Sequence, residues 1–292
     1  MATNKKEPEF TISRTNGDIK MFAGVDNGED SDVDLEGPEM DMLMKVTQSD
    51  LYKLAFNRDG WEYGFQQPHW SKVKKLADAI AKNLEFDSNW VKDEAKSARI
   101  LTFYIPVALW LEQQVRTGKK VDPVTGEYAS SLENAVCVGL SIPQGGGKTT
   151  ISSCLETALL ELDIKTGVVS YDDFYLTYED QQKVAKENPE NRFLQGRGTA
   201  GTHDIELGAQ TIDMMIKDEE INIPRYDKSA YKGKGDRAKP EDWMKMKGSL
   251  DLVIVEGWML GFQPVDPSSE VIKKEPGMEK VNELLAEYSM WE

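Results

Sequence analysis

The chain has 292 residues, 39% of them hydrophobic, and a formal net charge of −16 from 35 basic and 51 acidic side chains. This length can bury a sizeable core in one or two domains, and the apolar content excludes a wholly disordered chain. The negative charge argues against general binding to nucleic acid or to anionic membranes.

The N-terminal residues 1–41 are expected to form a disordered acidic tail, because residues 26–41 hold eight acids and no base. They show neither the apolar stretch of a secretory signal nor a clear transit peptide. No run in the chain approaches the roughly 18 apolar residues of a membrane span. Cys137 and Cys154 have no disulfide or metal spacing, so we expect a reduced, cytoplasmic setting.

Residues 42–131 are expected to form a helical N-terminal region that ends in a polar linker, 119–131. An apolar stripe at helical spacing runs along residues 73–84, and Asp41, Ser49 and Ser71 are candidate helix caps. Residues 100–115 form a second apolar helix, in which Pro106 predicts a kink or a new first turn. His69 lies in this region and is interpreted as structural.

Residues 132–292 are expected to form a nucleotide-binding domain organised around a glycine-rich turn. An apolar run at 136–140 predicts a buried strand, Gly145, Gly146 and Gly147 follow, and a helical pattern begins after Lys148 and Thr149. This order is typical of a phosphate-binding loop, in which backbone N–H groups and the helix N-terminus surround a phosphate. Ile142 departs from the motif, which has glycine at that position.

The residues of the loop are expected to bind ATP and Mg²⁺. Lys148 can reach the β- and γ-phosphates, and the Thr149 hydroxyl can bind Mg²⁺. The expected nucleotide-binding residues are Gln144, Gly145, Gly146, Gly147, Lys148, Thr149 and Thr150.

Two further apolar runs, 165–171 and 252–255, predict strands, and acids follow both of them. Strands that alternate with helices predict a parallel α/β sheet, and ligands bind such sheets at the carboxyl ends of the strands. Asp172, Asp173 and Glu256 should therefore meet near Lys148, which gives four candidate catalytic residues. One aspartate can accept the proton of an attacking hydroxyl while the other acts through Mg²⁺; the alternative is a pair that only caps a loop. Glu256 is either a metal ligand or a helix cap, so the expected metal set is Thr149, Asp173 and Glu256.

Positive charge gathers in two loops of this acidic chain, 193–201 and 226–242. A small anionic acceptor would need such a cationic clamp. The alternative is a solvated lysine-rich loop.

Six ordered motifs resemble the plant-type D-glycerate 3-kinases, which are related to uridine kinase, phosphoribulokinase and pantothenate kinase. They occupy residues 104–110, 141–150, 172–177, 197–204, 224–237 and 256–262. The resemblance implies a phosphate-loop kinase fold and phosphorylation of D-glycerate to 3-phosphoglycerate, as in photorespiratory carbon salvage. It also implies that Asp172 is the base. The residues that it places near the acceptor are Arg197, His203, Asp204, Tyr226, Lys228 and Arg237.

Other functions stay open. Fungal relatives with the same motifs have no settled substrate, so a uridine- or pantothenate-type kinase and a catalytically silent ATP-binding protein are alternatives. Plant members work in the chloroplast, for which this N-terminus gives no support. Only 36 residues follow Glu256, whereas the resembled kinases have further strands there. We therefore expect a chain that lacks its C-terminal part, a sheet with strand 136–140 at its edge, and weak or absent activity.

Overall fold

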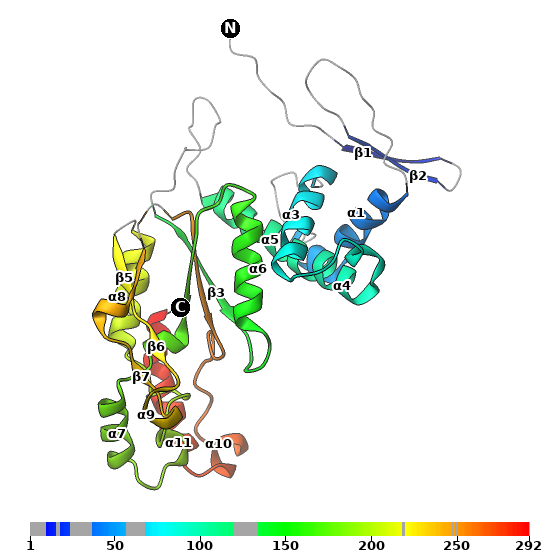
Figure 1. Ribbon diagram of the computed structural model, residues 1–292. Helices are drawn as coiled ribbons and strands as arrows, with labels where there is room; N and C mark the ends of the chain where they lie inside the picture. The colour runs from blue at the N-terminus through cyan, green and yellow to red at the C-terminus, as the bar shows by residue number, and fades with distance from the viewer. Residues whose placement is uncertain are drawn as a thin grey trace, which may run out of the picture. The chain divides into compact units, whose positions relative to one another are not determined.

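The computed structural model describes residues 10–15, 18–23, 37–56, 68–118, 134–217, 220–246, 248 and 250–291 (Figure 1). The chain divides into two compact units. Residues 1–113 and 153–162 form the first unit, and residues 114–152 and 163–292 form the second. The polar linker predicted at 119–131 lies outside the described residues.

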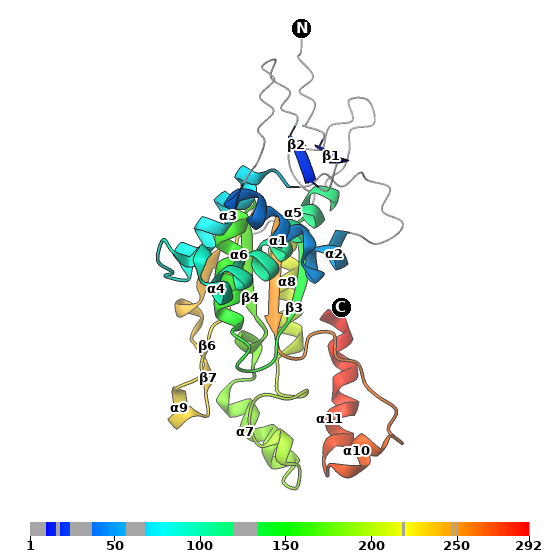
Figure 2. The same cartoon turned by 90° about the vertical axis from the view of Figure 1, so that its right-hand side faces the viewer.

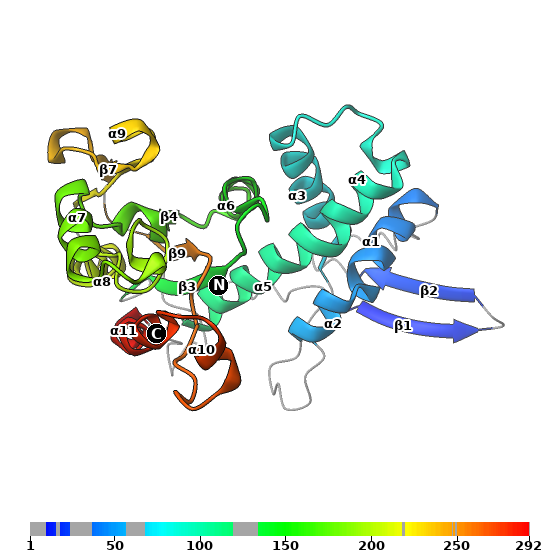
Figure 3. The same ribbon diagram turned by 90° about the horizontal axis from the view of Figure 1, so that it is seen from below.

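The first unit contains a β-hairpin near the N-terminus. β1 (Phe10–Thr15) and β2 (Asp18–Ala23) pair antiparallel (Figure 3), and α1 (Pro38–Gln48) follows. The prediction of a disordered tail through residue 41 is wrong for these segments. An Asn-Gly dipeptide separates the two strands in the sequence, and that dipeptide favours the tight turns of hairpins.

Helices make up the rest of the first unit, as the sequence predicts for this region. They are α2 (Asp50–Phe56), α3 (Trp70–Asn83), the 3₁₀ turn η1 (Trp90–Lys92), α4 (Glu94–Ala98), the π-helical turn η2 (Arg99–Tyr104) and α5 (Ile105–Gly118). The predicted stripe on α3 is buried from Val73 to Ile80. His69, not Ser71, caps α3, because its ring nitrogen accepts the Ser71 N–H at 3.2 Å. Pro106 lies near the start of α5, directly after the π-helical turn, so its missing N–H falls where the helical hydrogen-bond pattern changes.

The helix that follows the glycine turn, α6 (Lys148–Leu160), is shared between the units. Its later turns belong to the first unit, in which the Asn83 amide donates to Ser153 Oγ at 3.1 Å and to Thr157 Oγ1 at 2.9 Å. Lys75 forms an ion pair with Glu161 at 3.1 Å in the same unit.

A parallel sheet organises the second unit, as predicted. In the described part of the chain its order is β3 (Val136–Ser141), β9 (Leu252–Gly257), β4 (Thr166–Ser170). Every residue of β9 is buried because the strand is flanked on both sides, whereas β3 alternates between half-buried and exposed residues. β3 is therefore a strand, as predicted, and among the described residues it lies at the edge of the sheet, as also expected; the prediction that it is buried is wrong. Leu140 and Ser170 both pair with Glu256, so the three strands end at one level.

Two apolar clusters support the sheet and its loops. In the first, α8 (Ile205–Ile216) and the antiparallel pair β5 (Ile221–Ile223) and β8 (Met244–Met246) pack with β4 and β9. In the second, α11 (Met278–Leu285) and η6 (Ala286–Trp291) pack on Tyr171, Leu194 and Met259. The amphipathic segment predicted at 278–291 is therefore helical, and α10 (Glu270–Lys274) precedes it (Figure 2).

Shorter elements carry the loops at the carboxyl end of the sheet. These are η3 (Tyr171–Phe174), α7 (Tyr178–Glu187), η4 (Arg192–Leu194), β6 (Tyr226–Asp227), α9 (Ala230–Gly233), β7 (Asp236–Arg237) and η5 (Pro240–Asp242). None of the helices in the described ranges is both long and apolar enough to cross a membrane.

Candidate active site

The glycine turn between β3 and α6 has the backbone that a phosphate-binding loop requires. Gly145 and Gly147 have φ angles of +78° and +79°, which side chains rarely tolerate. A Cβ on Gly146 would lie 2.7 Å from Ile142 Cγ2, so a side chain is excluded there as well. Ile142 is buried, and its N–H donates to the Gly257 carbonyl at 2.7 Å. The residue that departs from the motif therefore fastens the turn to the central strand.

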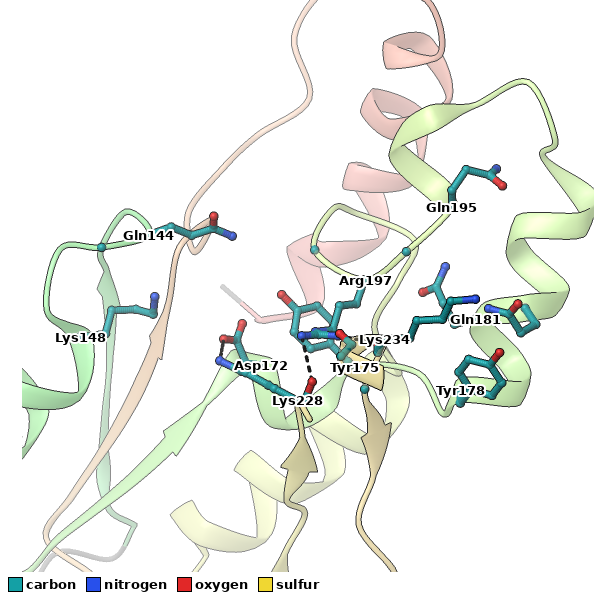
Figure 4. Close-up of a pocket in the computed structure, with 16 residues that line it drawn as sticks. Gln144, Lys148, Asp172, Tyr175, Tyr178, Gln181, Gln195, Arg197, Lys228 and Lys234 are labelled. Carbon is teal, nitrogen blue, oxygen red and sulfur yellow. Dashed lines mark hydrogen bonds and ion pairs between the residues drawn. The ribbon is translucent and has the colours of Figure 1, made fainter. Parts of the chain in front are cut away.

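One cavity of about 520 Å³ brings the glycine turn together with the predicted base and the basic loops (Figure 4). Gln144, Gly145 and Lys148 line one end, and Asp172 and Lys228 lie in its middle. The other end is lined by Tyr178 and by the glutamine side chains of α7, Gln181 and Gln182, together with Arg197 and Lys234. Gly146, Gly147, Thr149 and Thr150 belong to the same turn but do not line the cavity; both threonines are exposed.

Asp172 is a carboxylate that is held ionised. Lys228 Nζ lies 2.6 Å from its Oδ2, and the nearby Tyr175 also lowers the pKa of this carboxyl. Burial opposes ionisation, but the hydrogen bond and charge of Lys228, assisted by Lys148, bring the pKa of Asp172 below its ordinary value. The structure thus brings the predicted base and the phosphate-loop lysine to one cavity.

Asp173 was expected to be a metal ligand, but its carboxylate contacts Arg225 and the backbone of Tyr226 instead. Its Oδ2 is 2.7 Å from Arg225 Nη1, and its Oδ1 accepts the Tyr226 N–H at 3.1 Å. Burial raises the pKa of Asp173, although Arg225 partly offsets this. Because both oxygens are engaged and the residue does not line the cavity, it fastens the start of β6 to η3.

Glu256 ends the central strand as a buried carboxyl. Its Oε2 has no hydrogen-bond partner, and burial raises its pKa, which the Ser170 hydroxyl and the charges of Lys148 and Lys228 only partly offset. A buried oxygen of this kind fits a cation or a cation's water shell. The described residues contain no cluster of three or more His, Cys, Asp or Glu side chains that could hold a metal ion. Mg²⁺ does not need one, since it usually binds one or two carboxylates together with phosphates and water.

The cationic side of the cavity is built around Arg197. Its Nη1 donates to the carbonyls of Gly233, at 2.9 Å, and Lys234, and its guanidinium lies 5.5 Å from the centre of the Tyr226 ring. Gly235 is required beside it, because a Cβ there would lie 2.7 Å from Arg197 Nη1. The arginine therefore orders the 228–235 loop and keeps Lys228 and Lys234 on the cavity wall.

Four residues predicted near the acceptor do not line the cavity: His203, Asp204, Tyr226 and Arg237. Asp204 caps α8 by accepting the Leu207 N–H at 3.0 Å, and its Oδ2 lies 3.1 Å from Arg237 Nη1. Arg237 Nη2 donates to the Tyr175 carbonyl at 2.9 Å. These contacts support the cavity wall from behind.

The structure adds cavity residues that the sequence reasoning did not assign: Tyr175, Tyr178, Gln181, Gln182, Gln195 and Lys234. Tyr178 stacks on Tyr231 with 3.9 Å between ring centres, which holds α7 on the basic loop. Tyr175 and Lys234 lie inside the motifs at 172–177 and 224–237, and this position could have indicated that they line the cavity. Nothing in the sequence indicated that the glutamines of α7 do so, because the helix has the polar pattern of a surface helix.

No protein-family model matches the chain. It is 38% identical over 209 residues to the chloroplastic D-glycerate 3-kinase of Arabidopsis thaliana, which covers 68% of this chain and 43% of that protein. It is 45% identical over 132 residues to the uncharacterized kinase mug58 of Schizosaccharomyces pombe, which covers 44% of this chain and 48% of that protein. The chain thus spans less than half the length of either relative.

A solved structure agrees with these matches. The D-glycerate 3-kinase from Cryptococcus neoformans superposes with a TM-score of 0.55 at 28% sequence identity, covering 64% of this chain and 69% of that one. The chain is therefore similar to D-glycerate 3-kinases over most of its own length, and it has the fold of the phosphate-loop kinases.

Proposed function

We propose that the protein is an ATP-dependent small-molecule kinase that phosphorylates a hydroxyl group of D-glycerate. The observation that carries this proposal is that Lys148 and Asp172 line one cavity, whose far wall is cationic. A phosphate-loop lysine serves the phosphoryl donor, an ionised aspartate serves an attacking hydroxyl, and a cationic wall suits an acceptor with a carboxylate. The similarity to proteins named D-glycerate 3-kinase supports this acceptor.

In the proposed reaction the acceptor oxygen forms a bond to the γ-phosphorus of ATP as the bond to the β–γ bridging oxygen breaks. The hydroxyl proton passes to Asp172, and ADP and 3-phosphoglycerate leave. Lys148 stabilises the charge that develops on the transferring group, because its ammonium lies in the same cavity as Asp172. Lys228 changes its role on binding: it pairs with Asp172 in the free protein, and it can contact the acceptor carboxylate when glycerate enters.

We assign the Mg²⁺ site of this reaction to the Thr149 hydroxyl and to Glu256, with the ATP phosphates and water as the remaining ligands. The ion would neutralise charge on the β- and γ-phosphates. Asp173 is left out of this set, because Arg225 and the Tyr226 N–H already occupy its oxygens.

The test is ADP release measured with D-glycerate, L-glycerate, uridine and pantothenate in parallel, with the Asp172→Asn variant as background. We expect ADP release that depends on D-glycerate, although slow in a chain that spans less than half the length of its relatives, and a product that NMR identifies as 3-phosphoglycerate. Acceptor-independent ADP release would identify an ATPase, and ATP binding without ADP release under any condition would identify a catalytically silent nucleotide binder. Release with uridine or pantothenate alone would move the chain to another small-molecule kinase.

A further inference from the structure

The loop at 196–202 forms part of the cavity wall and is tied down from several directions. Gly198 N–H donates to Thr202 Oγ1 at 3.0 Å, and Trp258 Nε1 donates to the Gly198 carbonyl at 3.0 Å. Gly201 has a φ of +88°, and a Cβ there would lie 2.5 Å from Leu284 Cδ1 of α11. The loop is therefore in direct contact with a helix that lies outside all six motifs of the sequence.

Tyr288, in η6, makes the polar contact between this C-terminal segment and the loop. Its buried hydroxyl accepts the Gly201 N–H at 2.9 Å and lies 2.9 Å from His203 Nδ1. One hydroxyl thus joins the end of the cavity loop to the ring of His203.

The contact with Tyr288 involves Nδ1 of His203, whereas the buried Nε2 of the same ring has no hydrogen-bond partner among the described residues. Tyr288 is therefore the polar group that distinguishes the two nitrogens of the neutral ring and selects its tautomer. Burial lowers the pKa of His203 to about 3, which keeps the ring neutral, although the charge of Asp172 acts in the opposite direction. The other groups around the ring are Tyr171 and Tyr175.

The ring of His203 in turn supports the candidate base. Tyr175 stacks on it with ring centres 4.4 Å apart and an interplanar angle of 27°. Tyr175 lines the cavity, and it lies close enough to Asp172 to act on the pKa of that carboxyl. A continuous series of contacts therefore leads from Tyr288 through His203 and Tyr175 to Asp172.

We propose that Tyr288 is a positioning residue, which fixes the 196–202 loop and the tautomer and orientation of His203, and through Tyr175 the orientation of Asp172. The catalytic part of this proposal rests on the proposed function, whereas its structural part can be measured without any acceptor. It gives the 278–291 segment a role in the site that no motif assigns to it.

The first experiment observes the His203 ring directly by ¹⁵N NMR. The chain has two histidines, and His69→Asn, which keeps a capping side chain, removes the other signal. We expect a neutral ring with one dominant tautomer from about pH 7.5 to about pH 5, across the usual histidine pKa of about 6.5. Tyr288→Phe removes the hydroxyl beside Nδ1, so the second tautomer should appear. A wild-type ring that averages both tautomers, or ring signals that Tyr288→Phe leaves unchanged, would overturn the proposal.

The second experiment separates positioning from stability. Tyr288→Phe should lower kcat/KM for the acceptor between about 10- and 100-fold, with ATP affinity nearly unchanged, because only the acceptor side loses its alignment. Leu284→Ala should cost stability through lost packing but leave the His203 tautomer intact. Tyr104→Phe removes a buried hydroxyl that is 2.9 Å from Arg99 Nη2 in the first unit, and it should change neither readout.

These outcomes are distinguishable from a failure of the proposed function. If the wild-type chain phosphorylates no acceptor, the proposed function fails, and the ring signals still decide the role of Tyr288. If turnover is present and Tyr288→Phe behaves like Tyr104→Phe in both measurements, Tyr288 is only a packing residue.

Discussion

The two ends of the cavity are built in opposite ways. The phosphate-loop end is one short continuous segment, in which backbone angles at Gly145 and Gly147 create the shape and the side chains stay open to solvent. The acceptor end is assembled from segments between residues 172 and 237, and side chains such as Arg197 and Asp173 hold it by bonding to distant backbone groups. The phosphate-loop end depends on local geometry, whereas the acceptor end depends on long-range contacts. Substitutions at the two ends should therefore have different effects on rate, ligand binding and stability.

The largest effect is expected at Asp172. Asp172→Asn keeps the shape but cannot accept a proton, and a general base contributes about 10²–10⁴-fold in rate. Turnover with saturating D-glycerate should fall by that factor, while ATP affinity measured by calorimetry changes little. Near-normal turnover in this variant would remove the residue from the base role.

Next in size is the loss at the phosphate-loop end. Lys148→Ala removes a preorganised positive charge, and such contacts contribute about 10²–10³-fold in rate. Unlike Asp172→Asn, it should also weaken ATP binding, since the contact is to the phosphates. Lys165→Ala, an exposed lysine at the start of β4, is the matched control. Equal behaviour of the two lysine variants would contradict the assignment.

A pH profile tests how Lys228 serves the acceptor end. Burial alone would raise the pKa of Asp172, and Lys228 brings it below its ordinary value of 3.8. Lys228→Ala leaves burial unopposed by that charge, so the pKa rises and the acid limb of kcat/KM moves to higher pH. The measurement is kcat/KM against pH for both proteins. An acid limb that stays in place would show that Lys228 does not control the base.

Asp173→Asn is expected to act on stability more than on chemistry. It leaves Arg225 without its charged partner, and hydrogen bonds to charged groups contribute about 1–3 kcal/mol. Urea denaturation should show a loss in that range, together with a weaker acceptor affinity as β6 loosens. A loss of Mg²⁺-dependent turnover without a stability change would instead return Asp173 to the metal site.

The smallest effect is expected at Asp204, behind the cavity wall. Asp204→Ala removes the cap of α8, which costs about 0.5–2 kcal/mol. Asp204→Asn keeps a good capping side chain and loses only the charge opposite Arg237, so it should cost less. Thermal denaturation of both variants gives the comparison, and equal losses would place the contribution in the ion pair and not in the cap.

The same contrast explains what could be predicted from the sequence. The parallel sheet, the phosphate loop and Asp172 follow from contiguous patterns, because strands and glycine turns are local. Asp173 could not be separated from its neighbour, since its partner Arg225 is 52 residues away. His203, Asp204 and Arg237 were expected at the acceptor through motif position alone, which does not report whether a side chain faces the cavity or supports it. Tyr288 had no local signal at all.

The position of β3 at the sheet edge has a consequence for hydrogen exchange. The N–H groups of Val136 and Ile142 donate to Asp251 and Gly257, on the β9 side. Because successive amides of a strand point in opposite directions, those of Cys137, Gly139 and Ser141 face away from β9. Within the described residues β3 has no neighbour on that side. These three amides should therefore exchange with solvent much faster than their even-numbered neighbours. Their protection is a direct sensor of any strand that joins the phosphate-loop edge of the sheet.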